Sequence, residues 1–175
     1  MSLFEAVILG VVQGLTEFLP ISSSGHLVLA ESWLGLEVQE LLSFDVVLHA
    51  GTLLALLAYF WRDLWRMAQG LWIDIKKMLK INIEHDLRDP ENPREQVWYL
   101  IVATLPIIFI APYLKDSVEQ YFREPVMVVG MLGLTALLLG LAEVVGKRSE
   151  PRVDSWKTAL LMGLFQVVAV IPGIS

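Results

Sequence analysis

Apolar residues form long runs along this chain, and polar residues gather between the runs. Three of these runs approach the length of about 20 residues that a helix needs to cross a lipid bilayer. They cover residues 44–61, 97–114 and 125–145. Each run predicts a transmembrane helix.

Two further apolar segments, residues 1–43 and 156–175, are interrupted by proline, glycine and serine. In the first, an apolar stretch stops near Pro20, because the residue before a proline resists the helical conformation. A polar turn follows, and the apolar run after it, 26–36, is only about half as long as a membrane requires. This pattern predicts a re-entrant helical hairpin, since irregular backbone at membrane depth must be buried in protein or line a wet cavity.

Composition supports one all-α integral membrane domain over residues 1–175. Of the 175 residues, 55% are hydrophobic and 18% are charged, which excludes an ordinary soluble domain. The chain has no cysteine, so disulfides and thiolate metal sites are excluded. Its N-terminus lacks the basic residues of a signal peptide, and we expect this segment to stay in the mature protein. No nucleic-acid partner is expected.

Eleven of the thirteen basic residues lie within 62–96 and 147–157, whereas only Lys115 and Arg123 lie in the connection between the second and third spans. Because loops rich in lysine and arginine stay on the cytoplasmic side, this distribution predicts the orientation of the spans. Residues 62–96 are predicted to begin with an interfacial helix, rich in tryptophan and basic residues, and to continue as a solvated loop. The first re-entrant segment then opens to the outside.

The first broken segment carries polar residues that an ordinary membrane anchor would not contain. Gln13 and Glu17 stand one helical turn apart on one face. In the turn that follows, we expect Ser23 or Ser24 to cap a helix that begins at Gly25 or His26. The N–H groups and positive dipole end of such a helix, with the serine hydroxyls and the close backbone approach that glycine permits, predict an anion site suited to phosphate.

Two titratable side chains flank this turn. His26 could act there as a nucleophile, a general base or a proton donor. Glu17 could orient the histidine or hold a divalent cation through oxygen. The alternative is that Glu17 and His26 are paired interior groups without chemistry. Asp45 and His49, one turn apart in the first span, form either a second layer around the pocket or an interfacial pair.

A short repeat links the two broken segments. The sequence "GVVQ" at Gly10–Gln13 recurs as "GLFQ" at Gly163–Gln166, and a proline and a serine-bearing turn follow each copy. The first segment enters the membrane from outside and the second from the cytoplasm. We therefore expect inverted-topology repeats with re-entrant broken helices and a site at their interface, with the second repeat truncated at Ser175.

Three stretches carry a resemblance to a known family. "GVVQGLTEFLPISSSGH" (10–26) resembles the first signature of the undecaprenyl-diphosphate phosphatases of the bacitracin-resistance type. "FQVVAVIPGIS" (165–175) is similar to the start of their second signature, and "FDVVLHAGTLLALLAYFWRDL" (44–64) resembles their first full span. The resemblance extends over all 175 residues and corresponds to about the first two-thirds of a family member.

The resemblance implies a multi-pass hydrolase of the bacterial cell (inner) membrane. Such an enzyme removes the terminal phosphate of undecaprenyl diphosphate, regenerates the lipid carrier for peptidoglycan synthesis and depends on a divalent cation, Mg²⁺ or Ca²⁺. It implies that Glu17, Ser23 and His26 are catalytic and that Glu17 also binds the metal. The substrate-binding set is Gln13, Ser22, Ser24, Gly25 and Ser175.

Two questions stay open from the sequence. Either Ser23 is the nucleophile and His26 its base, or His26 attacks the phosphorus directly. The rival function is a membrane transporter or flippase for a polyprenyl-phosphate lipid, because broken helices in inverted repeats are also typical of transporters. We also expect a homodimer as a candidate assembly.

Overall fold

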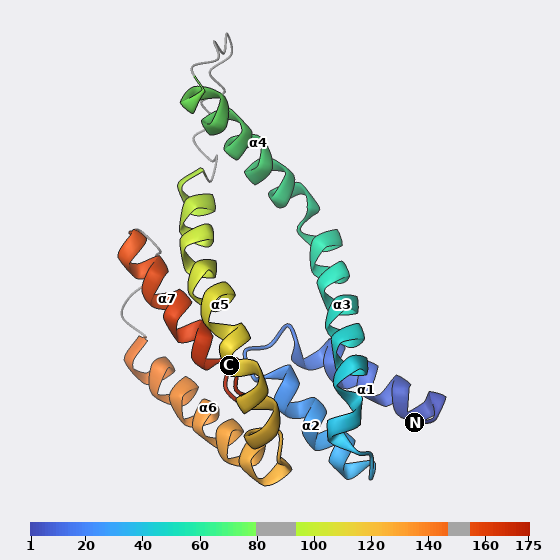
Figure 1. The fold of residues 1–175 in the computed structure, drawn as a ribbon. Coiled ribbons are helices and arrows are strands. Elements are labelled where there is room, and N and C mark those ends of the chain that lie inside the picture. The colour runs from blue at the N-terminus through green and yellow to red at the C-terminus, as the bar shows by residue number, and fades with distance from the viewer. Residues whose placement is uncertain (80–93, 147–154) are drawn as a thin grey trace.

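The computed structural model describes residues 1–79, 94–146 and 155–175. Every regular element in these ranges is helical, which confirms the all-α prediction for this part of the chain. Figure 1 shows the helices in chain order. They are α1 (Leu3–Thr16), α2 (Ser23–Trp33), the short 3-10 helix η1 (Val38–Leu41), α3 (Leu42–Tyr59), α4 (Trp61–Met78), α5 (Arg94–Tyr121), α6 (Pro125–Gly146) and α7 (Trp156–Val168).

Three stretches are long and apolar enough to cross a membrane: Val38–Tyr59, Val97–Val118 and Pro125–Val145. Only 11% of the most apolar part of each stretch is buried within the protein. Such surfaces would be a liability in water, whereas hydrocarbon is an equally apolar environment for them. The chain is therefore a membrane protein with three membrane-length helices in its described part.

The helix bounds differ from the predicted ones mainly at α5. The second predicted span, 97–114, lies inside the longer α5, which continues through Pro106 and Pro112. Proline removes a backbone donor, but membrane helices tolerate it where neighbouring groups supply other partners. Near Pro106 α7 packs closely on α5, since a Cβ at Gly163 would overlap the carbonyl oxygen of Ala103.

Beyond α3 the chain continues as α4 after a break at Phe60 (Figure 1). Trp61, Trp65 and Trp72 are exposed on α4, and the Lys76 ammonium lies 5.4 Å from the centre of the Trp72 ring. Amphipathic rings of this kind favour the headgroup level of a membrane. The interfacial placement of this helix stays a prediction, and the solvated loop predicted after it falls at residues 80–93, outside the described part.

Both broken segments begin with a serine cap and stop well short of a membrane span. The Ser2 hydroxyl accepts the Glu5 N–H and the Glu5 carboxylate accepts the Ser2 N–H, which is a capping box at the start of α1. Ser155 caps α7 in a similar way by accepting the Thr158 N–H. Each helix thus has a defined start, and each ends where the chain turns before a proline.

The two breaks meet in the interior of the molecule. A Cβ built on Gly25 of α2 would lie 2.8 Å from the Cα of Gly173, so these two backbones touch. The Ser22 hydroxyl accepts the Gly173 N–H at 3.0 Å, and Thr135 of α6 donates to the Gly173 carbonyl at 2.6 Å. Figure 1 shows the C-terminal end reaching the turn between α1 and α2. Segments about 150 residues apart are thereby joined at one point.

Candidate functional site

The turn between α1 and α2 is set by Ser22. Its φ of 66° is left-handed, which is uncommon for a residue other than glycine and marks a functional or strained position. Its hydroxyl accepts the Gly25 N–H at 3.4 Å as well as the Gly173 N–H. The predicted cap at Ser23 or Ser24 is therefore wrong. The cap is Ser22, and α2 begins at Ser23, because the left-handed residue turns the chain earlier than the sequence suggests.

Two of the predicted site residues converge on one carboxylate oxygen of a third, Oε2 of Glu17. The Gln13 amide Nε2 donates to it at 2.9 Å, and the Ser23 hydroxyl donates to it as well. Gln13 also donates to the Thr52 hydroxyl at 3.3 Å, which fixes the orientation of its amide. This confirms that Gln13 and Glu17 share one helix face, and it brings Ser23 to them from the other side of the turn.

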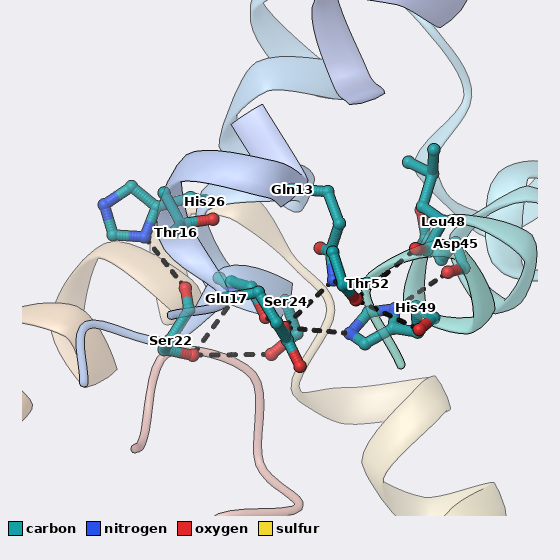
Figure 2. A network of polar contacts seen from close by, with 12 residues as sticks. Gln13, Thr16, Glu17, Ser22, Ser24, His26, Asp45, Leu48, His49 and Thr52 are labelled. Carbon is teal, nitrogen blue, oxygen red and sulfur yellow. Dashed lines mark hydrogen bonds and ion pairs between the residues drawn. The ribbon is translucent and has the colours of Figure 1, made fainter. Parts of the chain in front are cut away.

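His49 of α3 also approaches Glu17. Its Nε2 lies 4.0 Å from Oε2 of Glu17, and its Nδ1 lies 2.7 Å from the backbone carbonyl oxygen of Asp45, one turn earlier on the same helix (Figure 2). The imidazole keeps 40% of its side-chain surface exposed. Of the two alternatives for the Asp45 and His49 pair, the structure favours a place beside the polar turn.

His26 lies elsewhere. Its Nδ1 is 2.8 Å from the Ser22 carbonyl oxygen, and Figure 2 shows its ring on the far side of Ser22 from Glu17 and His49. The ring is not among the groups that line the cavity described next. No hydrogen bond or ion pair joins His26 to Glu17 or Ser23 in the described part of the chain. Its catalytic role stays a prediction.

A cavity of about 1340 Å³ opens beside the Glu17 carboxylate. One part of its wall is polar and includes Glu17, His49, Gln166 and the serine turn. The rest is mainly apolar and comes from α5, α6 and α7, with Leu100, Leu134, Leu138, Met162 and Phe165 among its residues. A cavity with one polar wall and otherwise apolar sides suits an amphiphile.

The predicted binding residues take different places around this cavity. Ser22, Ser24 and Ser175 line it, and Ser24 lies 3.4 Å from Ser22 between their hydroxyl oxygens. Gly25 is buried against Gly173, so its lack of a side chain serves helix contact in this structure. Gln13 is 1% exposed and reaches the cavity only through Glu17.

A buried charged cluster beneath the site was missed by the sequence reasoning. Arg123, assigned from its position to an outer loop, is only 7% exposed. Its Nη2 lies 2.7 Å from the Asp45 carboxylate and 3.6 Å from the Glu31 carboxylate, and both acids are buried. The only signal available was the cost of placing acids within apolar segments, which requires a buried partner of opposite charge.

Fold and site together define a helical membrane protein with a polar centre built at a helix break and joined to an amphiphilic cavity. The chain belongs to the family described as Bacitracin resistance protein BacA, whose pattern matches residues 6–175.

Curated relatives that carry the name undecaprenyl-diphosphatase match the whole chain. The protein of Methanosphaera stadtmanae is 40% identical, that of Rubrobacter xylanophilus 41% and that of Parabacteroides distasonis 38%. The chain spans 63%, 62% and 60% of the length of these three relatives. Their name gives the activity of the longer proteins.

Proposed function

We propose that this chain forms part of an undecaprenyl-diphosphatase, an enzyme that hydrolyses undecaprenyl diphosphate to undecaprenyl phosphate and inorganic phosphate. The printed names of its relatives support the activity. The observation that carries the proposal is the Ser23 hydroxyl donating to the Glu17 carboxylate at the polar wall of the apolar cavity. A carboxylate in this position can take the proton of an attacking hydroxyl.

The cavity accounts for the class of substrate. A diphosphate headgroup needs hydrogen-bond donors, which the serine turn and the first N–H groups of α2 supply. An isoprenoid tail needs an apolar path, and the side chains of α5, α6 and α7 provide one. Membrane-length helices around the cavity would let the tail stay in the lipid phase throughout.

In the chemistry we propose, the Ser23 oxygen attacks the terminal phosphorus while Glu17 accepts the hydroxyl proton. The bond between this phosphorus and the bridging oxygen breaks, and undecaprenyl phosphate leaves with the bonding electrons. Glu17 passes its proton to the departing undecaprenyl phosphate. Water then attacks the phosphoserine while Glu17 accepts a proton from this water and returns it to the serine oxygen, and inorganic phosphate leaves. This assignment replaces His26 with Glu17 as the partner of Ser23, because Glu17 is the group that the hydroxyl contacts.

A divalent cation, Mg²⁺ or Ca²⁺, is part of the proposal, with Glu17 as a ligand. Within residues 1–79, 94–146 and 155–175 no group of three or more histidines or acids converges. Glu17 and His49 nevertheless present two donor atoms at the polar wall, which fits an ion held mainly by substrate oxygens and water. Gln13 turns its amide N–H groups toward Glu17 and is oriented as a donor there. When bound, such an ion would neutralise phosphate charge.

We also propose inverted-topology repeats for this fold, in a multi-pass protein of the bacterial inner membrane. Supporting observations are the matched serine caps of α1 and α7, their early ends, and the contact between the two breaks at Gly25 and Gly173. A homodimer stays a prediction.

Phosphate release in detergent tests the activity. We would supply the purified 175-residue chain with farnesyl diphosphate, with and without EDTA, and measure inorganic phosphate. Cation-dependent release is the expected result. A transporter would release no inorganic phosphate, because transport breaks no phosphate bond and detergent solution has no compartments to move the lipid between. Absence of phosphate release, together with uptake of the lipid in proteoliposomes, would overturn the proposal in favour of transport.

A further inference from the structure

His49, for which the sequence left open a place around the pocket or in an interfacial pair, lies beside the Glu17 carboxylate. His49 comes from α3, 23 residues beyond the end of the first signature at His26, and it lines the cavity together with Glu17. We propose that His49 is a ligand of the divalent cation and binds it through Nε2. This inference rests on the proposed function, because the diphosphate would complete the coordination of the ion.

Hydrogen bonding fixes the tautomer of the His49 ring. The carbonyl oxygen of Asp45, 2.7 Å from Nδ1, can only accept, so Nδ1 carries a hydrogen. In the neutral ring this leaves the lone pair on Nε2, which faces Glu17 (Figure 2). Metal-binding histidines nearly always donate their other ring N–H to a carbonyl or carboxylate in this way.

The distance between the two donor atoms also fits. Oε2 of Glu17 and Nε2 of His49 are 4.0 Å apart. Metal–ligand bonds are about 2.0 to 2.4 Å for the ions concerned, so one ion can reach both the Glu17 carboxylate and Nε2 of His49. A direct hydrogen bond between them is excluded at this distance. No hydrogen bond therefore joins these two described side chains, and a cation between them would bind both.

Both ligands are held by further partners, as a metal site requires. Gln13 and Ser23 donate to the Glu17 carboxylate and fix its direction. Asp45, whose carbonyl orients His49, has its own carboxylate 2.7 Å from buried Arg123. The ion pair with Arg123 thus holds the first turn of α3 in position, and this turn orients the His49 imidazole toward the cavity.

An imidazole ligand changes which ions the site favours. Carboxylate, phosphate and water oxygens suit Mg²⁺, Ca²⁺ and Mn²⁺, whereas imidazole suits ions such as Zn²⁺. With only Glu17 and His49 from the described protein, the ion needs phosphate oxygens to be held firmly. We therefore expect Mn²⁺ and a diphosphate to strengthen the binding of each other.

The test uses Mn²⁺ as the probe and needs no turnover. Binding of Mn²⁺ to the purified chain in detergent is followed by electron paramagnetic resonance, with and without a non-hydrolysable isoprenyl diphosphonate. Electron spin-echo modulation then shows whether a ¹⁴N nucleus couples directly to the bound ion. We expect nitrogen coupling in the unaltered chain, and tighter Mn²⁺ binding when the diphosphonate is present.

Two histidine variants locate the ligand. His49→Ala should lose the nitrogen coupling and bind Mn²⁺ at least about tenfold more weakly, since loss of a mere outer partner costs 10- to 100-fold. His26→Ala is the matched control, because it also removes one imidazole near the turn, and it should keep the coupling. Circular dichroism and the melting temperature of both variants show that they remain folded.

The outcomes separate this inference from the proposed function. Bound Mn²⁺ without nitrogen coupling in the unaltered chain would overturn the role of His49, whatever the variants do. Phosphate release that persists in that case would leave the diphosphatase intact. A chain that binds neither Mn²⁺ nor the diphosphonate and releases no phosphate would overturn both.

Discussion

A methyl group added at Gly25 should force the two broken segments apart. In the structure, a Cβ at this position lies 2.8 Å from the Cα and 2.9 Å from the N of Gly173, and 3.1 Å from Cδ2 of Leu132. Two of these three neighbours are backbone atoms, which cannot rotate away as a side chain can. The variant Gly25→Ala must therefore shift one break relative to the other.

Two contributions lower the free energy of unfolding of Gly25→Ala, and one raises it. Overpacking of a closely packed interior costs about 1 to 3 kcal/mol, and loss of the hydrogen bond from the Gly173 N–H to the Ser22 hydroxyl costs about 1 kcal/mol. Replacing glycine by alanine within a helix returns about 1 kcal/mol. We expect net destabilisation of about 1 to 3 kcal/mol.

Thermal unfolding in detergent, followed by circular dichroism, measures this effect. Gly14→Ala in α1 is the matched control, because a Cβ there meets nothing within 4 Å. The control should be as stable as the unaltered chain or slightly more stable. Equal melting temperatures for Gly25→Ala and Gly14→Ala would refute the close contact between the breaks.

Two other substitutions test the packing around the site. Gly163→Ala should lower the melting temperature in detergent, because its Cβ would overlap the Ala103 carbonyl and move α7 away from α5; an unchanged melting temperature would contradict this packing. Arg123→Gln should destabilise the protein by about 3 to 5 kcal/mol in denaturant titration, because it leaves the buried Asp45 carboxylate without its cation. The exposed Arg66 is the control, since its loss should change stability by less than about 1 kcal/mol. Similar effects of the two arginine substitutions would contradict the buried cluster.

Local rules carried much of the prediction from the sequence. The three long apolar runs became α3, α5 and α6, because run length alone indicates a membrane helix. The pairing of Gln13 with Glu17 followed from helical spacing, which places residues four apart on one face. These features depend only on neighbours along the chain.

Long-range contacts were beyond such rules. The cap fell on Ser22, which has a left-handed backbone and whose hydroxyl also accepts the N–H of Gly173, about 150 residues away. His49 reaches Glu17, and Arg123 reaches Asp45 and Glu31, only through the packing of separate helices. No spacing in the sequence relates these residues. Part of the predicted site was therefore in place, and a position of His49 around the pocket was one of the two alternatives from the sequence, whereas the buried arginine came from the fold.

The central claim is that the Ser23 hydroxyl on the Glu17 carboxylate performs the attack on phosphorus. The most direct measurement is the rate of phosphate release from farnesyl diphosphate by the unaltered chain, Ser23→Ala and Ser24→Ala in detergent. Ser23→Ala should lose at least about a thousandfold in rate, as removal of a nucleophile does. Ser24→Ala keeps the hydrogen bond from Ser23 to Glu17 and should lose much less rate. A Ser23→Ala chain that releases phosphate within tenfold of the unaltered rate would contradict the claim.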